Sequence, residues 1–365
     1  MTKLHSTPQE RYEYISTQHG GYWRHGFTDH NYLYNLYFPP EEFFTHIIEH
    51  VHQLVLNYPI AQNDLAGLVG ELIGQPPERI VVGNGAAELI KIIAGLKRKL
   101  IVPVPSFNEY VNAAPAGSVS QFSLDPPSFQ LDVEKFAKEA LRQQARLAIV
   151  VTPNNPTSLL VPKDQLIYLA EELAAHDCML IVDESFIDFA RNGDQETLAN
   201  EIEKYSNLAI IKSMSKAYGI CGIRIGYMLT SNVDFLDQVR QGLHIWNING
   251  FAEEFLRLAP RYRDKFKQSC IKVMDDRDRF YQELKTIPGM IVYPPAANYI
   301  FCRLPSHSLS APEVIERLFV DHNIYLKHCE GKTMPESDRY VRIACRTQPE
   351  NLRLVEALSS ILASE

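Results

Sequence analysis

The stretch from Ile211 to Tyr227 reads IKSMSKAYGICGIRIGY and predicts a tight loop beside a buried core. Its flanks, LAII and IRIGYML, are apolar runs typical of short buried strands. Between them, Lys216 follows the small hydroxyl residues Ser213 and Ser215, and Arg224 stands eight residues later, beyond two glycines. A lysine on such a loop is expected to differ from an ordinary surface charge.

The chemistry of this loop suggests a cofactor. Burial favours the neutral amine of Lys216, and a neutral amine can form a Schiff base with an aldehyde. Arg224 stays charged and suits a phosphate group. Pyridoxal phosphate carries both an aldehyde and a phosphate, so the pair predicts this cofactor. From these residues alone, a loop with a solvated lysine and a structural arginine remains the alternative, and the rest of the chain must discriminate.

Composition places the chain among ordinary globular proteins. It has 365 residues, 45% hydrophobic and 22% charged, which is enough for a substantial core in one large or two medium domains. A net charge of −8 without a long Lys/Arg run argues against nucleic-acid binding. The N-terminus is polar and no apolar run has the length of a membrane span, so we expect a cytoplasmic protein without a membrane partner.

Cysteine and histidine give no metal or disulfide signal. The six cysteines are scattered and form no CxxC pair, so we expect reduced packing residues. His46 and His50 are four residues apart and could grip a metal from one helix face, but the sequence offers no third ligand. A solvated helix face is the better interpretation, and no metal site is predicted.

Short apolar strands alternate with helical segments through the middle of the chain. The runs RIVVG, LIVPVP, LAIVV and CMLIVDE are followed by further strands near 208–212 and 224–229. This alternation predicts an α/β fold with a mostly parallel sheet covered on both faces, in which ligands bind beyond the carboxyl ends of the strands. Five candidate residues stand just past predicted strand ends: Gly85, Phe107, Asn155, Asp183 and Lys216.

The chain divides into three predicted segments. Residues 1–40 are rich in aromatic residues, His and Gly and read as an ordered arm, and residues 41–250 form the large domain. A long helical region at 251–284 leads into a smaller α+β domain, residues 251–365. In the smaller domain we expect strands and helices at 290–293, 299–304, 311–322, 340–345 and 349–363.

Four motifs in combination carry a family resemblance. They are GNGAAE at 83–88, PNNPT at 153–157, VDESF at 182–186 and SMSKAYGICGIRIG at 213–226. Together they resemble the fold-type I pyridoxal-phosphate enzymes of the class I/II aminotransferase family, from LNYP at 56–59 to ACRT at 344–347. The resemblance implies an aspartate-aminotransferase-like fold with a seven-stranded sheet. Within the family the chain is similar to histidinol-phosphate aminotransferase and threonine-phosphate decarboxylase.

The resemblance also implies roles for residues around the cofactor. Lys216 would bond the cofactor and later transfer a proton, and Asp183 would pair with the pyridine nitrogen. Asn155 would donate to the phenolic oxygen, and Phe107 would stack on the ring. The residues implied to hold the phosphate are the amides of Gly85, Ala86 and Ala87 together with Ser213, Ser215 and Arg224.

Other implied roles concern the substrate and a second subunit. Tyr58, in LNYP, matches a family tyrosine that reaches the cofactor phosphate of the partner subunit, which implies a homodimer with shared sites. Arg342 would bind the substrate carboxylate. Arg346 and the N-terminal arm, with His19, would bind a distal anion, and Asn35 would serve the roof over the substrate.

The chain departs from the aminotransferase pattern at Phe186, where many transaminases carry a tyrosine whose hydroxyl touches the phenolic oxygen. Asn155 is then expected to be the sole partner of that oxygen. The HGG at 19–21, PSFNEY at 105–110 and RIACRT at 342–347 are more similar to the threonine-phosphate decarboxylase branch.

Three functions follow from these observations. We favour decarboxylation of a small amino acid that bears a phosphate or phosphonate, and transamination of the histidinol-phosphate type is the alternative. A non-catalytic regulator that binds the cofactor is a third possibility, but such proteins carry a DNA-binding domain. An acidic chain without a basic helix argues against it.

Overall fold

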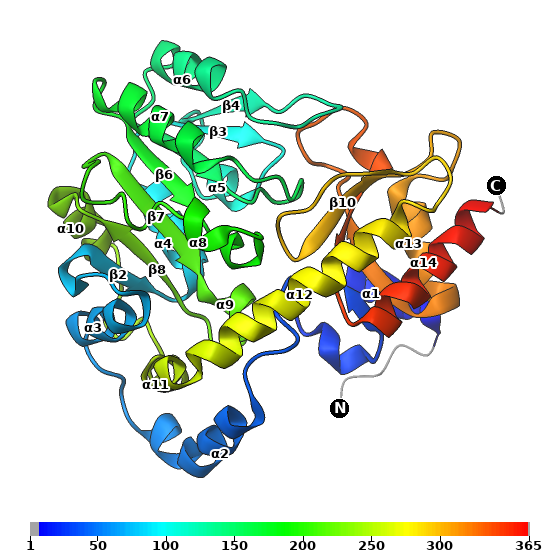
Figure 1. The fold of residues 1–365 in the computed structure, drawn as a ribbon, viewed down its shortest axis with the longest axis horizontal. Helices are drawn as coiled ribbons and strands as arrows, with labels where there is room; N and C mark the ends of the chain where they lie inside the picture. Colours follow the sequence, from blue (N-terminus) through cyan, green and yellow to red (C-terminus); the bar gives the residue numbers. More distant parts are fainter. Residues whose placement is uncertain (1–6, 364–365) are drawn as a thin grey trace.

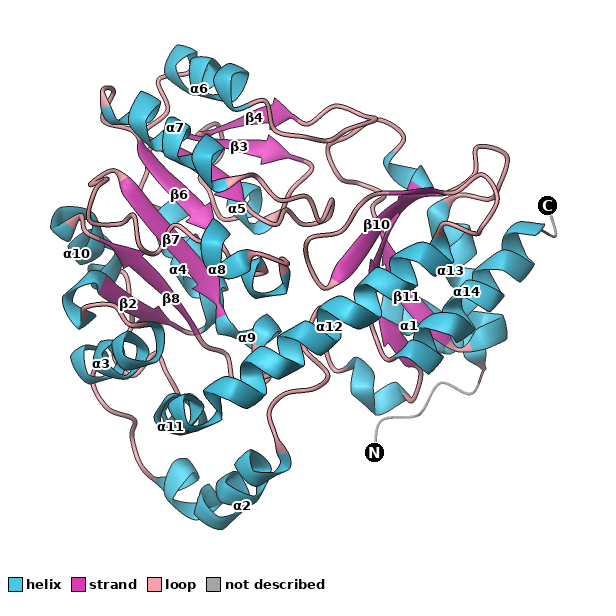
Figure 2. Ribbon diagram, viewed as in Figure 1, coloured by secondary structure: helices cyan, strands magenta, loops and turns pink. Residues whose placement is uncertain are grey.

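The computed structural model describes residues 7–363, and a seven-stranded sheet forms the centre of its larger part (Figures 1 and 2). The strands are β2 (Ile80–Gly83), β3 (Leu100–Val104), β4 (Val119–Ser123), β5 (Leu147–Val151), β6 (Met179–Asp183), β7 (Leu208–Ser213) and β8 (Gly226–Thr230). Their order is β2-β8-β7-β6-β5-β3-β4, and β8 alone runs antiparallel to its two neighbours in this sheet. The predicted α/β fold with a mostly parallel sheet is confirmed.

Helices cover both faces of this sheet, which explains why its central strands are apolar throughout. Side chains alternate between the faces: in β6, Leu180 and Val182 belong to one buried cluster and Ile181 to the other. The first cluster also contains residues of α3 (Gln62–Ile73), α6 (Val133–Arg142), α7 (Lys163–Ala174) and α11 (Gly250–Leu258). The second contains residues of α4 (Gly85–Ala94), α5 (Glu109–Asn112) and α10 (Val233–Gln241).

A second sheet of five strands forms the smaller part of the molecule. Its strands are β1 (Thr28–His30), β9 (Ile291–Val292), β10 (Tyr299–Arg303), β11 (Ile324–His328) and β12 (Tyr340–Ala344), in the order β1-β11-β12-β10-β9. The helices of this part are α1 (Pro8–Ser16), α13 (Ala311–His322) and α14 (Gln348–Ala363). The long helix α12 (Arg263–Leu284) runs from the larger part to the smaller one (Figure 1).

The N-terminal segment, which we predicted as an ordered arm over residues 1–40, contains regular secondary structure. It begins with α1, which contacts α13, and its strand β1 pairs in parallel with β11 at the edge of the five-stranded sheet. The segment therefore extends the smaller sheet. Strands β4 and β11 were not predicted either.

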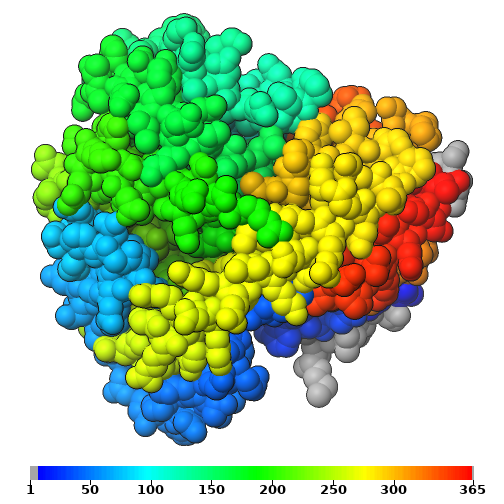
Figure 3. Space-filling view, viewed as in Figure 1, coloured from blue at the N-terminus to red at the C-terminus, as the bar shows by residue number. Residues whose placement is uncertain are grey.

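The remaining helices are α2 (Glu41–Leu56), α8 (Gly193–Glu196) and α9 (Met214–Ala217). Helix α2 lies at the lower edge of the molecule, away from both sheets (Figures 1 and 3). His46 on α2 contacts Glu254 at 2.6 Å and stacks on His50. Within residues 7–363, no group of three potential ligands could hold a metal ion, and no helix has the length and apolar composition to cross a membrane.

Candidate active site

A cavity of about 780 Å³ opens beyond the carboxyl ends of the parallel strands. Its walls come from the N-terminal segment, the ends of β5, β6 and β7, the start of α4, and β12. Most of the residues predicted from sequence line this one cavity: His19, Ala86, Ala87, Phe107, Asn155, Asp183, Ser213, Lys216, Arg224 and Arg342. The structure thus brings together side chains that are spread over more than three hundred positions of the chain.

Lys216 lies on the short helix α9, directly after strand β7. Its backbone carbonyl accepts a hydrogen bond from the amide of Asn35 at 2.8 Å, which fixes the turn. Its Nζ lies 5.7 Å from the centre of the Phe186 ring. Burial lowers the pKa of Lys216 despite the opposing charge of Asp183, and the positive charge of Arg224 lowers it further. This direction eases loss of the proton from Nζ, and the deprotonated amine is the nucleophilic form.

Asp183 ends strand β6 with a side chain that is only 4% exposed. Its Oδ2 accepts a hydrogen bond from the hydroxyl of Tyr110 at 2.9 Å, and its Oδ1 accepts one from the amide of Ser185 at 2.9 Å. Burial and the nearby carboxylate raise the pKa of Tyr110 well above its usual value, so the hydroxyl stays a donor. The carboxylate is oriented in advance toward the cavity, where it can pair with a protonated ring nitrogen.

Tyr110 was missed in the sequence. It stands three residues after Phe107 in PSFNEY, on the short helix α5. The motif itself was recognised, but its second aromatic residue carries no feature that points to a carboxylate 73 positions away.

The start of α4 and Arg224 together form a cradle for an anion. Gly85 begins the helix with φ +70°, and a Cβ added there would lie 2.4 Å from Nη2 of Arg224. Glycine is thus what allows the guanidinium to approach the helix N-terminus. Arg224 also has a positive φ of 63°, and its Nη1 donates to the hydroxyl of Ser215 at 3.4 Å. Free backbone amides, the helix dipole and a fixed cation fit a phosphate group.

A second arginine lies at the smaller sheet. Nη1 of Arg342, on β12, donates to Oδ1 of Asn155 at 3.1 Å, and its Nη2 donates to the backbone carbonyl of Asn31 at 2.6 Å. Its Nε is buried and has no hydrogen-bond partner among residues 7–363. Arg342 lines the cavity, and a fixed guanidinium in such a place is suited to a carboxylate. Asn31 was not predicted, because it lies in the segment for which we expected no strand.

Asn35 and Arg346, which were predicted to take part in substrate binding, are not among the residues that line the cavity. The side chain of Asn35 donates to the carbonyl of Ala217 at 2.9 Å and to the hydroxyl of Ser269 at 2.8 Å, so it supports the turn that carries Lys216. Arg346 donates to the carbonyl of Asp29 and to the carboxylate of Glu350, both at 2.9 Å. Protein acceptors therefore already use these donors, and their predicted part in substrate binding stays a prediction.

Tyr58 is also remote from the cavity lining. It is 77% exposed and stacks on Trp246 with ring centres 4.1 Å apart. Gly85 and Ser215 do not line the cavity, but both contact Arg224 as described above.

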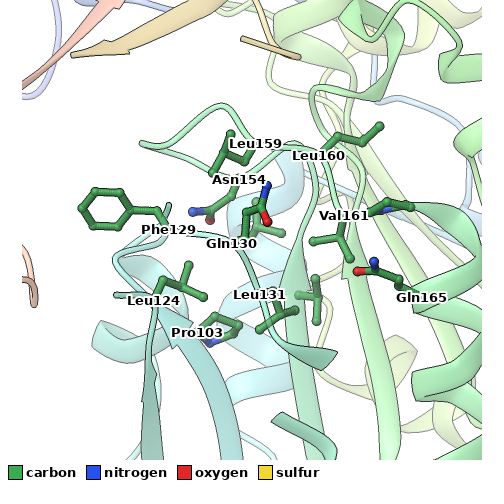
Figure 4. A pocket seen from close by; sticks show the side chains of 13 residues that line it. Pro103, Leu124, Phe129, Gln130, Leu131, Asn154, Leu159, Leu160, Val161 and Gln165 are labelled. Carbon is green, nitrogen blue, oxygen red and sulfur yellow. The ribbon is translucent and has the colours of Figure 1, made fainter. Parts of the chain in front are cut away.

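A second cavity, of about 190 Å³, lies near the loop that follows β5. Figure 4 shows apolar side chains such as Leu124, Leu131 and Val161 around it, with the amides of Gln130 and Asn154. Among the described residues that line it, none carries a charged side chain. The larger cavity is therefore the candidate active site.

Comparisons with known proteins agree with this geometry. Residues 40–358 match the family model described as aminotransferase class I and II. Over 357 residues the chain is 40% identical to CMP-5'-(3-aminopropyl)phosphonate synthase of Streptomyces rubellomurinus, a match that covers 98% of this chain and 56% of the synthase. The chain thus spans little more than half the length of that relative.

Two further comparisons cover most of both chains. The L-serine phosphate decarboxylase of Sulfurospirillum multivorans is 31% identical over 319 residues, which are 85% of this chain and 80% of the relative. The crystal structure of histidinol-phosphate aminotransferase from Clostridium acetobutylicum superposes with a TM-score of 0.84 at 27% identity, covering 93% of this chain and all of that chain. The likeness therefore extends to decarboxylases and to aminotransferases.

Proposed function

Because the chain belongs to the aminotransferase class I and II family, we propose that it binds pyridoxal 5'-phosphate and decarboxylates a small amino acid that carries a phosphate or phosphonate. Members of this family depend on that cofactor. The observation that carries the proposal is the convergence of a buried lysine amine, a buried carboxylate and an arginine–helix cradle on one cavity.

The residues present fit the cofactor in detail. The cradle of Arg224 and the first turn of α4 would bind its phosphate, and Asp183 would pair with its ring nitrogen. Lys216 would hold it covalently, with Phe107 against the ring. When bound, pyridoxal phosphate accepts the electron pair that is left on the α-carbon after a bond to that carbon breaks.

The remaining steps belong to side chains of this protein. The guanidinium of Arg342 would bind the substrate carboxylate and turn it out of the plane of the ring, so that the bond from the α-carbon to the carboxylate breaks and carbon dioxide leaves. Lys216 would take up the proton that the ammonium group of the substrate gives up on binding, and would then give a proton to the α-carbon. The ring of Phe186 beside Nζ limits the water that reaches this amine.

Transamination of the histidinol-phosphate type is the second candidate, supported by the superposition with that aminotransferase. In it Lys216 would remove the α-proton, and the carboxylate would stay. The same residues serve both reactions. We favour decarboxylation because two relatives at 40% and 31% identity are, by their names, a phosphonate synthase and a serine phosphate decarboxylase.

We also propose that the protein is a homodimer. Helix α2 exposes a row of apolar side chains: Ile48 is 72% exposed, Val55 66% and Leu56 78%. Ile245, next to the Tyr58–Trp246 stack, is 78% exposed. Contiguous exposed apolar side chains of this kind mark an interface. A second copy would cover them, and Tyr58 would then reach the phosphate cradle of its partner.

The test uses the holoenzyme with serine phosphate, threonine phosphate, phosphonoalanine and histidinol phosphate, each with and without 2-oxoglutarate. Release of carbon dioxide without the keto acid would support decarboxylation. Glutamate formation that requires Lys216 would instead establish transamination. Borohydride should attach the cofactor to Lys216 in either case, and a protein that retains no cofactor after borohydride would overturn the whole proposal.

A further inference from the structure

The mouth of the cavity carries an exposed indole. Trp23 lines the cavity and yet is 79% exposed, the largest exposure among the large hydrophobic side chains described. The guanidinium of Arg24 lies 4.3 Å from the centre of its ring. Within residues 7–363, no carboxylate forms a salt bridge with Arg24, so its charge is available to a ligand.

The turn that carries this pair is well anchored. Its 3₁₀ segment, Tyr22–His25, lies between Gly21 and Gly26, which both have positive φ angles. Tyr22 is buried, stacks on Tyr32 with ring centres 4.7 Å apart, and donates its hydroxyl to the carbonyl of Gln18 at 2.6 Å. Tyr32 in turn lines the cavity. The anchored turn therefore holds the indole in a fixed place at the cavity, where a planar ligand could cover the ring.

The cavity has the volume and the two kinds of lining residue that two subsites need. Its volume of about 780 Å³ lies in the upper part of the range of roughly 300–1,000 Å³ that ligand pockets span. The lysine, carboxylate and cradle belong to the sheet end, whereas His19, Trp23 and Tyr32 come from the N-terminal segment. A flat aromatic platform beside a cation fits a planar heterocycle joined to an anion.

We propose that Trp23 and Arg24 form a subsite for a nucleotide, and that the substrate is an amino acid whose phosphonate or phosphate is joined to a nucleoside 5'-monophosphate. The base stacks on Trp23, and Arg24 pairs with the phosphate linkage. This inference rests on the proposed decarboxylation. It is supported by the 40% identical synthase, whose name describes a phosphonate linked to CMP.

The first arm of the test is binding. Calorimetry with the holoenzyme measures the affinity for CMP, cytidine and inorganic phosphate in wild type, Trp23→Ala, Trp23→Phe and Arg24→Gln. We expect CMP to bind, Trp23→Ala to weaken it at least about fivefold, and Trp23→Phe to restore most of the affinity, because base stacking accepts any aromatic ring. Arg24→Gln should weaken CMP but not cytidine. Arg261→Gln removes an exposed charge elsewhere and should change neither.

The second arm is turnover. The same phosphonate amino acid is offered free and as its CMP ester, and carbon dioxide is measured. A kcat/KM at least tenfold higher for the ester, with the advantage lost in Trp23→Ala, is expected. Equal rates for both substrates, with no CMP binding, would overturn the nucleotide subsite and leave the proposed decarboxylation intact. CMP binding that depends on Trp23, with no release of carbon dioxide from either substrate, would overturn the proposed decarboxylation and leave the nucleotide subsite intact.

A third outcome concerns a second copy of the chain. If the partner subunit covers Trp23, wild type should not bind CMP. Trp23→Ala should then weaken the dimer in sedimentation. That result would overturn the inference. Since Trp23 is mostly exposed in the chain, its replacement should not impair folding, and Trp23→Phe provides a folded control with the ring retained.

Discussion

Replacing Tyr110 by Phe isolates the hydrogen bond that orients Asp183. The ring of Tyr110 is fully buried, so the phenyl group keeps its packing and only the hydroxyl is lost. That hydroxyl donates to Oδ2 of Asp183 at 2.9 Å, and the other oxygen of the carboxylate keeps its bond from the amide of Ser185. A hydrogen bond to a buried charged group is worth about 1.5–3 kcal/mol, so the apoprotein should lose about that much unfolding free energy.

The cofactor should reduce this loss. A protonated ring nitrogen gives Asp183 a new partner, and a carboxylate with one fewer donor binds it more strongly. Urea unfolding at a fixed protein concentration should therefore show that pyridoxal phosphate stabilises Tyr110→Phe more than it stabilises wild type.

The matched control is Tyr299→Phe. Tyr299 is also fully buried, but its hydroxyl donates to the neutral carbonyl of Asn154 at 2.8 Å, which also accepts from the amide of Ser158. Its loss should be about 0.5–1.5 kcal/mol, with no change in the stabilisation by cofactor. If the two variants behave alike, or if the cofactor stabilises Tyr110→Phe less than wild type, the role assigned to the Tyr110–Asp183 bond is refuted.

Three other predictions use variants with built-in controls. Gly85→Ala should lower pyridoxal-phosphate affinity at least about tenfold in titrations of the apoprotein, because its Cβ would displace Arg224. Both Gly85→Ala and Gly74→Ala should lose about 1–2 kcal/mol of stability, because both glycines have a positive φ, but Gly74 lies in open space and its replacement should keep the affinity. Ile48→Asp on α2 should dissociate the dimer in sedimentation, whereas Val233→Asp, also exposed, should not. Burial lowers the pKa of His30 to about 4, so between pH 6.5 and 4 the unfolded chain binds a proton that the folded chain does not. As the pH falls through this range, the unfolding free energy from urea titrations should fall by up to about 3 kcal/mol; His30→Gln should lose this dependence and His52→Gln should keep it.

The parts of the fold that sequence predicted are those with a continuous physical signal. Strands β5 and β6 are wholly buried, so LAIVV is apolar at every position and CMLIVDE is apolar up to Val182. Strand β4 reads VSQFS and is only half buried at the sheet edge, so its polar residues interrupt the apolar run by which a strand is predicted. Helix α1 carries a capping box, Thr7 with Glu10, but it has no strong apolar face, so no helix was predicted there.

The site divides in the same way. Residues just past strand ends were predictable, because parallel strands bring their carboxyl ends to one edge. The contacts that orient these residues were not, since they join segments that are distant in the chain: Asn31 contacts Arg342 across 311 positions. No periodicity or spacing encodes such a pair, which depends on how the two sheets meet.

Arg342 connects these observations to the choice of reaction. From β12 of the smaller sheet, its side chain contacts the loop after β5 through Asn155 and the N-terminal segment through Asn31. Asn155 is also the proposed partner of the phenolic oxygen of the cofactor, so the carboxylate site and the ring site share one amide. A shift of the N-terminal segment would therefore move Arg342 relative to the ring and change which bond of the α-carbon stands perpendicular to it. If the proposed roles of Trp23 and Arg342 hold, the segment that carries Trp23 and Asn31 would therefore influence both the substrate that fits and the bond that breaks.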